Sequence, residues 1–377
     1  MQQDRIKPRG MMVIHQFRPI INGAELQAER LAIRLAQRGH EMQVFTELRV
    51  PGSLPEEDMQ GVRVHRVDFK MAYRILAGVE STFRYLAKAQ KSYDILHVHQ
   101  VFGHAVVSIV VARVFKKRCI VKVACAGSYG DLNVFSKFPG FKGALSIMKQ
   151  ADCIIAISSD VEKELLEWGF SHGQIRRIPN GVDIEYFKRE QPFPERDPVR
   201  FVLIGRRTPQ KGIDIALQAA RILMNDGLNK KFEIKFYGSD HSEYDFRHMA
   251  EELGVTPLVE FLPHQDAIRD ILHHAHSLIL PSRGEGMPNV LLEAMSFKLP
   301  VIASRVSGVV DIIEDNMDGI LIPSEDSHAL ASAMKRIIME SDLAARLGRQ
   351  ARKKVASEFS LESMADKYSA LYEQLWR

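Results

Sequence analysis

Short apolar runs alternate with amphipathic helical patterns along most of the chain. Met11–Phe17 (MMVIHQF) predicts a strand, and the apolar spacing over Ala24–Arg38 predicts a helix that ends at Gly39. Strands separated by helices are typical of right-handed βαβ units and a parallel sheet. The other strands expected in this first series are Glu41–Thr46, Val62–Val67, Asp94–Val98, Cys119–Ala124, Cys153–Ile157 and Ile175–Ile178.

The alternation lapses over Asp183–Arg200, a polar stretch with three prolines that we interpret as an interdomain linker. A second series begins at Phe201. Its expected strands are Phe201–Gly205, Phe232–Gly238, Leu258–Leu262, Ser277–Pro281, Val301–Ala303 and Gly319–Ile322. Its helices are expected at about 212–225, 265–275, 287–297 and 326–340, and an amphipathic last helix at about Leu361–Trp376.

This pattern predicts an α/β protein with two doubly wound, Rossmann-like domains that face each other across a cleft. A chain of 377 residues is also too long for one ordinary core. We place the domains at residues 1–185 and 186–360, with 361–377 as a C-terminal helix. Ligands bind outside the carboxyl ends of such strands, so function is expected in the cleft.

Composition favours a globular cytoplasmic protein, with 46% hydrophobic and 26% charged residues. The first ten residues lack the apolar core of a signal peptide, and the longest apolar stretch, Ala105–Phe115, is too short to cross a bilayer. The three cysteines show no Cys-x-x-Cys spacing and are expected to be reduced thiols.

Charge is distributed unevenly along the chain. Residues 1–190 hold 28 Lys and Arg against 20 Asp and Glu, a net charge of +8, whereas residues 191–377 hold 23 against 27, a net charge of −4. A basic first half attracts an acidic acceptor or an anionic membrane surface, although an ordinary solvated surface gives the same count. The amphipathic stretch Met71–Gln90 favours contact with a lipid-linked or polysaccharide acceptor; its alternative is a helix packed on the first sheet.

The strongest chemical signal is the segment from Pro281 to Met295 (PSRGEGMPNVLLEAM). A strand ends at Pro281, a glycine-rich turn follows, and a helix begins near Pro288. Glycine permits close backbone approach, and the amides of a helix N-terminus favour an anion. Glu285 lies in the turn, and Glu293, eight residues later, is placed to accept two hydrogen bonds from a sugar diol. The alternative is that both are solvated surface acids.

A second constellation follows the first strand of the second series, from Gly205 to Gly212 (GRRTPQKG). Arg206 and Lys211 flank a tight turn that leads into a helix. Arginine grips phosphate oxygens in pairs and lysine supplies a compact charge, so together they neutralise a leaving diphosphate. Arg207 is a candidate third contact, although adjacent side chains usually diverge. An exposed charge run is the alternative.

Three further segments carry weaker signals. The turn Asn22–Glu25 opens the first helix and is suited to a phosphate or to simple helix capping; no Gly-x-Gly-x-x-Gly is present. His97 and His99 end a strand, where we expect them to point to opposite faces, and no histidine pattern predicts a metal site. The loop Lys122–Asp131 is expected to face the cleft, with Cys125 as a small packed thiol.

In order and spacing these segments resemble the retaining glycosyltransferases of family 4, also called group 1, which have the GT-B fold. The resemblance spans most of the chain, and each of its motifs is short. Its residues are Asn22 to Glu25, Gly39 to Glu41, Asp94 to His99, Ala151-Asp152 with Ser158, Ile178 to Asp183 with Phe187, Gly205-Arg206, Lys211-Gly212, Pro281-Ser282, and Glu285 with Glu293.

The resemblance implies a role for each matching residue. Arg206 and Lys211 would bind the donor's diphosphate, Glu285 the transferred sugar and Glu293 the ribose hydroxyls. Gly23 would meet the phosphate from the first, acceptor-binding domain, and the last helix would cross back to that domain and seat Trp376 there. Amides around five consecutive residues would orient sugar and phosphate: Gly286, Met287, Pro288, Asn289 and Val290.

Two positions depart from the family pattern. Many relatives carry His-Gly where this chain has Ala126-Gly127, which leaves open whether Lys122, Ser128, Tyr129, Asp131 or a backbone carbonyl takes over. Ser307-Gly308 stands where a glycine pair is frequent.

The resulting hypothesis is a metal-independent, retaining hexosyltransferase of cell-envelope polysaccharide biosynthesis, without a cofactor. Its partners would be a nucleotide-diphosphate sugar donor, an acceptor that is a glycan, a lipid-linked molecule or a small molecule, and an anionic membrane surface, but no nucleic acid. The enzyme would be cytoplasmic or peripheral on the inner face of the membrane. Open alternatives are a catalytically silent nucleotide-sugar-binding subunit, a sugar-nucleotide epimerase and, with its glycine fingerprint missing, a dehydrogenase.

Overall fold

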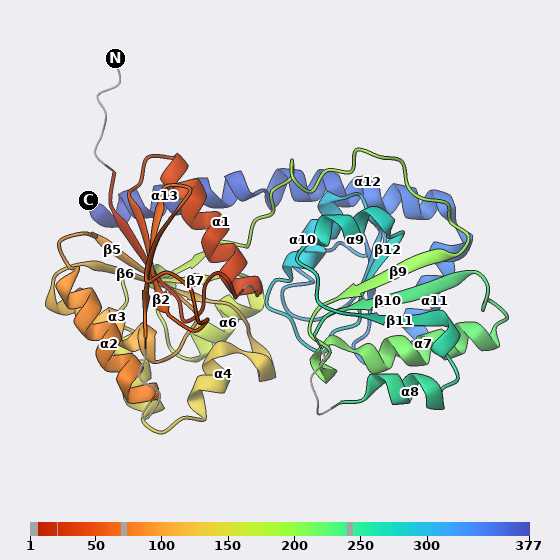
Figure 1. Ribbon diagram of the computed structural model, residues 1–377, viewed down its shortest axis with the longest axis horizontal. Coiled ribbons are helices and arrows are strands. Elements are labelled where there is room, and N and C mark those ends of the chain that lie inside the picture. The colour runs from red at the N-terminus through yellow and green to blue at the C-terminus, as the bar shows by residue number, and fades with distance from the viewer. Residues whose placement is uncertain (1–6, 21, 69–73, 240–243) are drawn as a thin grey trace, which may run out of the picture. The chain divides into compact units, whose positions relative to one another are not determined.

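The chain is organised around two separate, predominantly parallel sheets, as shown by a computed structural model that describes residues 7–20, 22–68, 74–239 and 244–377 (Figure 1), the side chains of 74–77 excepted. Unit 1 comprises Met1–Gly181 together with Leu361–Arg377, and unit 2 comprises Val182–Ser360. Each unit has its own sheet, helices and apolar core. The chain therefore enters unit 2 once and returns to unit 1 for its last helix.

The sheet of unit 1 has eight strands in the order β3-β4-β2-β1-β5-β6-β7-β8. All neighbours are parallel except β3 and β4. Fully buried apolar runs such as MMV in β1 and ILHV in β5 place these strands in the middle of the sheet. The strands are β1 (Gly10–Val13), β2 (Met42–Glu47), β3 (Glu56–Met59), β4 (Val62–Val67), β5 (Ile95–His99), β6 (Arg118–Val123), β7 (Cys153–Ala156) and β8 (Ile175–Arg177).

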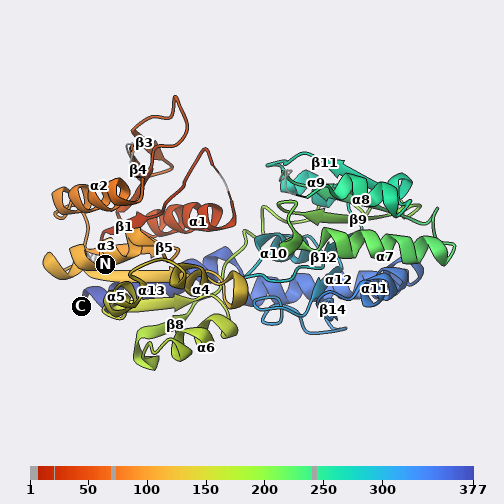
Figure 2. The ribbon, with the colours of Figure 1, turned by 90° about the horizontal axis from the view of Figure 1, so that it is seen from below.

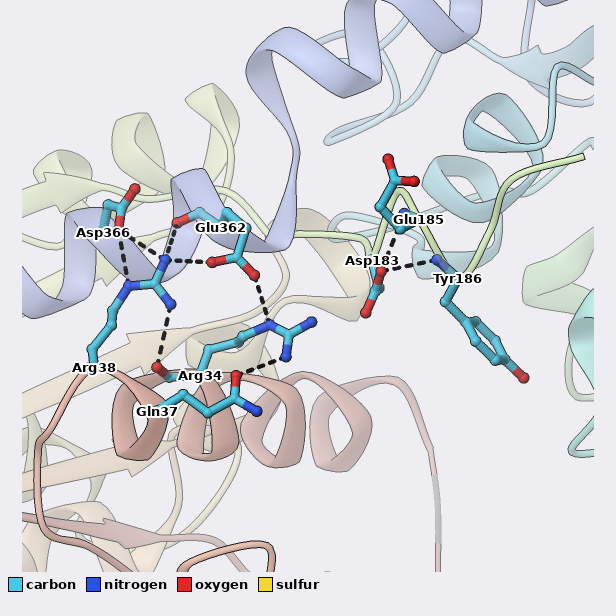
Figure 3. A network of polar contacts seen from close by, with 8 residues as sticks. All are labelled: Arg34, Gln37, Arg38, Asp183, Glu185, Tyr186, Glu362 and Asp366. Carbon is cyan, nitrogen blue, oxygen red and sulfur yellow. Dashed lines mark hydrogen bonds and ion pairs between the residues drawn. The ribbon is translucent and has the colours of Figure 1, made fainter.

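Seven α-helices are described in unit 1 (Figures 1 and 2), and the last of them belongs to the end of the chain. Helix α13 packs against α1, and its Tyr368 and Tyr372 are fully buried. Arg34 of α1 and its C-cap residue Arg38 form ion pairs with Glu362 of α13 (Figure 3). The helices are α1 (Gly23–Gln37), α2 (Arg74–Lys88), α3 (Gly103–Val114), α4 (Asp131–Ser136), α5 (Phe141–Met148), α6 (Ser159–Glu167) and α13 (Leu361–Trp376).

The sheet of unit 2 has six parallel strands in the order β11-β10-β9-β12-β13-β14. From the central pair β9 and β12, the chain winds outward in one direction through β10 and β11 and in the other through β13 and β14. The strands are β9 (Val199–Ile204), β10 (Phe232–Tyr237), β11 (Val259–Leu262), β12 (Ser277–Leu280), β13 (Val301–Ser304) and β14 (Ile320–Ile322). The helices are α7 (Ile213–Asn225), α8 (Phe246–Glu252), α9 (Ile268–His274), α10 (Asn289–Ser296), α11 (Ser327–Met339) and α12 (Ser341–Glu358).

Most of the expected strands and helices are confirmed, and the last helix has the expected bounds. The expected strand Met11–Phe17 is too long, because β1 stops pairing with β2 at Val13. The stretch expected as a linker, Asp183–Arg200, belongs to unit 2: its Phe187 is buried and β9 already begins at Val199. The apolar pattern failed there because a few anchoring side chains hold an otherwise polar segment.

Candidate active site

Two loops of unit 2 meet at the point where the winding of the sheet reverses. One follows β9 and the other follows β12, and these two strands are hydrogen-bonded neighbours. In a doubly wound sheet the chain leaves the two central strands in opposite directions, which opens a ligand site at their carboxyl ends. The loops are residues 205–212 and 281–288.

Glycine allows these two loops to touch. Gly212 begins α7 with a φ of +67°, and a Cβ on it would lie 1.9 Å from the carbonyl oxygen of Pro281. On the other side, Gly308 has a φ of +73°, and a Cβ there would lie 1.5 Å from the carbonyl oxygen of Gly286. A larger residue at Gly212 would push the two loops apart, and a larger residue at Gly308 would separate the segment after β13 from the second loop. This close contact with Gly286 explains why the second residue of the Ser307-Gly308 pair is a glycine.

Lys211 and Glu285 form an ion pair across the two loops. The Lys211 Nζ lies 2.7 Å from Glu285 Oε1, and the Ser282 hydroxyl donates to the same oxygen at 2.7 Å. The exposed fractions of the two charged side chains are only 15% and 8%, so water screens the pair weakly. Two of the predicted site residues are therefore brought into direct contact.

Arg283 of the second loop also links the two loops, through contacts separate from the Lys211–Glu285 pair. Its guanidinium forms a bidentate contact with Asp214 of α7 (2.9 and 2.7 Å) and a third hydrogen bond with Glu325 at 2.8 Å. It also donates to the Pro209 carbonyl at 2.6 Å. Its two carboxylate partners raise the pKa of Arg283 further above its usual range. The sequence reasoning gave Arg283 no role, although an arginine between two turn segments is a typical clamp.

Gln210 adds two further links between the loops. Its side-chain amide donates to the Gly284 carbonyl at 2.9 Å, and its own carbonyl accepts the Arg283 N–H at 2.8 Å. The positions of Lys211 and Glu285 are consequently fixed by neighbours on both sides. This matters for catalysis, because preorganised charges need not be rearranged during the reaction.

The helix that follows the second loop, α10, carries the other predicted donor residues. Glu293 lies in its second turn and is 3% exposed, and Met287 just before the helix is 6% exposed. Pro288 is the N-cap residue, with Asn289 and Val290 as the first helical residues. The expected helix start is confirmed. The amides at this end lie next to the loop that carries Glu285.

The two arginines of the first loop have different environments. Arg206 is exposed. Arg207 is buried, donates to the carbonyls of Gly238 and Leu262, and lies over the ring of Phe261 with its guanidinium carbon 5.7 Å from the centroid. The divergence expected for adjacent side chains is present, and it removes Arg207 from the candidates for phosphate contact.

The equivalent edge of the sheet in unit 1 contains histidines. Its winding reverses between β1 and β5. The expectation that His97 and His99 point to opposite faces is wrong: their rings stack with centroids 4.5 Å apart, because residues i and i+2 share one face of a strand. Both are fully buried, and His97 Nδ1 lies 3.0 Å from the Tyr372 hydroxyl on α13.

Gly23 and Lys122 lie at this edge of unit 1 as well. Gly23 is exposed at the start of α1, next to a capping box formed by Asn22 and Glu25. The Lys122 ammonium is buried and donates to Asn180 Oδ1 at 2.9 Å, and burial lowers its pKa to about 8.

The loop that has Ala126-Gly127 in place of His-Gly is held by two carboxylates. Asp131 Oδ2 accepts the Ala124 N–H at 2.7 Å, and Glu164 Oε2 accepts the Gly127 N–H at 2.7 Å. Burial raises the pKa of Asp131 to about 6. Asp131 therefore serves its own loop, whereas Ser128 and Tyr129 are exposed.

Neither a metal cluster nor a membrane-spanning helix is found in the part of the chain that the structure describes. No three His, Cys, Asp or Glu side chains there are grouped as metal ligands would be. No described helix is long and apolar enough to cross a bilayer. The stretch Met71–Gln90 lies partly outside the described residues; its described part contains most of α2, where Leu86 is buried and Phe83 is 40% exposed.

Comparisons with known proteins agree with this geometry. The family model described as glycosyl transferases group 1 matches residues 183–354, and the model described as glycosyltransferase family 4 matches residues 21–186. The N-acetyl-alpha-D-glucosaminyl L-malate synthase of Bacillus anthracis is 23% identical over 95% of this chain and 96% of its own length. The amylovoran biosynthesis glycosyltransferase AmsK of Erwinia amylovora is 29% identical over 61% of this chain and 58% of its own length.

The solved structures include HepE of Anabaena in complex with UDP and glucose. It is 16% identical, with a TM-score of 0.79 over 97% of this chain and 100% of HepE, which shows the shared GT-B fold. The two family models together run from residue 21 to residue 354. The chain therefore belongs to the retaining glycosyltransferases of family 4, the group 1 glycosyltransferases, which transfer sugars from nucleotide sugars.

Proposed function

We propose that this glycosyltransferase moves a hexose or an N-acetylhexosamine from a nucleotide-diphosphate sugar to a polysaccharide, lipid-linked or small-molecule acceptor without a metal ion. The observation that carries the proposal is the ion pair of Lys211 and Glu285 at the switch point of unit 2, with Ser282 on the same carboxylate oxygen. The pair supports the proposal because a cation suited to phosphate lies beside an acid suited to sugar hydroxyls.

Lys211 and Arg206 bind the diphosphate in this proposal. A phosphate oxygen that enters beside Lys211 competes with Glu285 for the ammonium, and Glu285 then turns to the hydroxyls of the transferred sugar. Glu293 holds the ribose, and the backbone from Gly286 to Val290 orients the sugar and the phosphate. The assignment of Gly23 to the donor stays a prediction.

The reaction breaks the bond between the anomeric carbon and the phosphate oxygen and forms a bond from that carbon to an acceptor hydroxyl on the same face. The cations stabilise the charge that grows on the leaving diphosphate. The departing phosphate takes the proton of the acceptor hydroxyl. No protein nucleophile enters this scheme, and burial raises the pKa of Cys119 and Cys153 well above the usual thiol range.

The donor and acceptor classes are supported by the relatives. One of them is named as an N-acetylglucosaminyl transferring enzyme, another belongs to amylovoran biosynthesis, and HepE binds UDP and glucose. We extend the proposal to a role in cell-envelope polysaccharide biosynthesis at the inner face of the membrane. These relatives support it, as does the net positive charge of the first half of the chain.

A thermal-shift screen followed by a transfer assay tests the proposal. UDP-glucose, UDP-N-acetylglucosamine, GDP-mannose and ADP-glucose are compared at equal concentration, because the donor that binds most tightly raises Tm the most. The best donor, labelled in its sugar, is then incubated with lipid-linked, polysaccharide and small-molecule acceptors in the presence of EDTA. We expect a glycosylated acceptor of unchanged anomeric configuration and free nucleoside diphosphate.

Other outcomes separate the alternatives. Donor stabilisation without product formation would identify a silent nucleotide-sugar-binding subunit. An isomerised free sugar made without an acceptor would identify an epimerase. If EDTA abolishes the activity and Mg²⁺ restores it, only the metal independence in the proposal is contradicted, and the transfer reaction stands.

A further inference from the structure

A cationic cavity lies at the amino ends of the central strands of unit 1, the edge opposite to the histidines. It has a volume of about 520 Å³ and is lined by residues from three places in the chain. Asp94 precedes β5, the segment from Ala112 to Arg118 joins α3 to β6, and Leu375 with Trp376 ends α13. In parallel strands all amino ends lie at one edge of the sheet and all carboxyl ends at the other. This cavity is therefore separate from the carboxyl-end loops of the same sheet.

Positive charge is in excess around this cavity. Among the lining residues, Asp94 is paired with Arg9 at 2.9 Å and Arg118 with Asp152 at 2.9 Å. Arg113 donates to the Gln150 carbonyl, which carries no full charge, and the Lys117 ammonium lies 5.7 Å from the centroid of the Tyr93 ring. The lining residues thus include four cations (Arg113, Lys116, Lys117 and Arg118) and one carboxylate, Asp94, an excess of three positive charges.

Lys116 has a backbone conformation that usually belongs to glycine. Helix α3 ends at Val114, the Lys117 N–H bonds to the Ala112 carbonyl at 2.8 Å, and Lys116 has a φ of +53°. This is the helix-ending arrangement in which glycine is the common residue at the left-handed position. A lysine there keeps a positive charge at the cavity despite a less favourable backbone.

Apolar and aromatic surface adjoins the cations. Trp376 is 46% exposed, and Val114 on α3 is 61% exposed. An indole beside several cations is suited to a ligand that is part anionic and part apolar, since the ring contacts the apolar part while the cations neutralise the charge.

We propose that this cavity binds a phosphate group, as a site separate from the donor loops of unit 2. The ligand chemistry is a phosphate or diphosphate ester whose charge is held by Lys116, Lys117 and Arg113 and whose remainder lies along Trp376. The phosphate comes either from a free phosphorylated metabolite or from the headgroup of an anionic lipid, and the experiment distinguishes these sources.

Trp376 provides the readout. The chain has one other tryptophan, Trp168, so the W168F protein reports on this cavity alone. Its emission is titrated with inorganic pyrophosphate, with phosphatidylglycerol vesicles and with phosphatidylcholine vesicles at low salt. Saturation by pyrophosphate identifies a free phosphorylated ligand, and a response to phosphatidylglycerol vesicles alone identifies a lipid headgroup; both support the site. No response, or an equal response to both vesicle types, overturns it.

Two matched glycine substitutions test whether the charge or the backbone matters. Lys298 also follows a helix end, with a φ of +62°, and is exposed in unit 2. We expect both Lys116→Gly and Lys298→Gly, in the W168F protein, to raise Tm slightly, by about 2 °C, because glycine relieves the backbone. Lys116→Gly should weaken the binding of the responding phosphate probe about threefold, since one exposed charge contact is lost. Lys298→Gly should leave it unchanged.

A double substitution, Lys116→Gly with Lys117→Gln, should weaken that binding about tenfold. Exposed Lys137 and Lys142 on the same unit, both changed to Gln, are its control. Equal affinity in the double substitution and in its control overturns the proposal. Because the site is separate from the donor loops, its failure would leave the proposed transfer reaction unaffected.

Discussion

The carboxyl edges of the two sheets are similar in topology and different in charge. In unit 2, Lys211 and Glu285 meet across neighbouring loops as a charged pair. In unit 1, the same kind of edge holds the buried, stacked His97 and His99, and burial lowers the pKa of His97 to about 3 and the pKa of His99 well below its usual value. These imidazoles are neutral at pH 7. The edge of unit 2 pairs a lysine with a carboxylate, whereas the edge of unit 1 sets neutral histidines beside the Lys122 ammonium, which bonds to the uncharged amide of Asn180.

Under the proposed function, this difference would assign donor and acceptor to different units. In the proposed reaction the leaving diphosphate carries the charge that changes, and the edge of unit 2 offers it Lys211, in a loop that is linked to its neighbour by Arg283 and Gln210. A neutral histidine can accept or donate a hydrogen bond to a hydroxyl group, which is the functional group of a sugar acceptor. Each prediction below removes one element of this contrast.

The largest effect is expected from Lys211→Ala. Loss of a hydrogen bond to a charged group removes about 1.5–3 kcal/mol, which lowers kcat roughly 10- to 100-fold. Steady-state kinetics at saturating donor measure it. The matched control is Lys235→Ala, which breaks an exposed pair with Glu260 at 3.0 Å in the same unit and should leave kcat unchanged. A near-normal kcat in Lys211→Ala would remove Lys211 from the reaction.

Glu293→Gln should mainly weaken donor affinity, about tenfold, because the charged acceptor of two ribose hydrogen bonds becomes neutral. Glutamine keeps the size of this buried side chain, so the fold of α10 is retained. Isothermal titration with the donor identified by thermal shift measures the change. Glu260→Gln serves as the control acid, and equal donor affinity in both variants would exclude Glu293 from the site.

Arg283→Met tests whether the contacts of Arg283 position the pair of Lys211 and Glu285. Arg283 does not contact the donor in this proposal, so we expect kcat to fall about three- to tenfold with little change in donor KM. Arg283→Lys should recover only part of the loss, because lysine cannot form the bidentate contact with Asp214. Arg305→Met removes an exposed arginine 3.5 Å from Asp315 and is the control. A purely structural arginine would instead lower Tm and leave kcat of the folded enzyme unchanged.

The sequence predicted most strands and the strand–turn–helix segment from 277 to 296 for a physical reason. Buried parallel strands are short continuous apolar runs, and the segment 281–295 joins a strand, a glycine turn and a helix within a few residues. The pairing of Lys211 with Glu285 was also within reach, since neighbouring central strands bring their loops together.

Features that depend on distant partners were missed. The edge strand β3 is polar and exposed, so its pattern resembles a loop, and it forms through pairing with β4. The role of Arg283 depends on Asp214 and Glu325, which lie far from it in the sequence. Asp131 was a candidate for the chemistry of the missing histidine, but its hydrogen bond to Ala124 assigns it to the loop. Such assignments need coordinates because each rests on a contact without a local signature.

The smallest effect concerns this loop of unit 1. Burial raises the pKa of Asp131 to about 6, above the value of about 3.9 for a free carboxyl. The native state therefore binds the proton more tightly than the unfolded state, and the free energy of unfolding falls as pH rises from about 4 to 6. Above pH 6 the charged carboxylate costs about 1 kcal/mol, reduced because Asp131 keeps some solvent exposure.

Asp131→Asn removes this cost while its amide oxygen still accepts the Ala124 N–H. We expect the stability advantage of the variant over the wild type to be about 1 kcal/mol larger at pH 7.5 than at pH 4.5. Urea unfolding at both pH values measures it. Asp160→Asn, a change of an exposed acid on α6, should show no such gain. A gain that is equal at the two pH values would mean that the Asp131 carboxyl does not titrate in this window. The loop would then be held in the same way at every pH at which the enzyme is assayed.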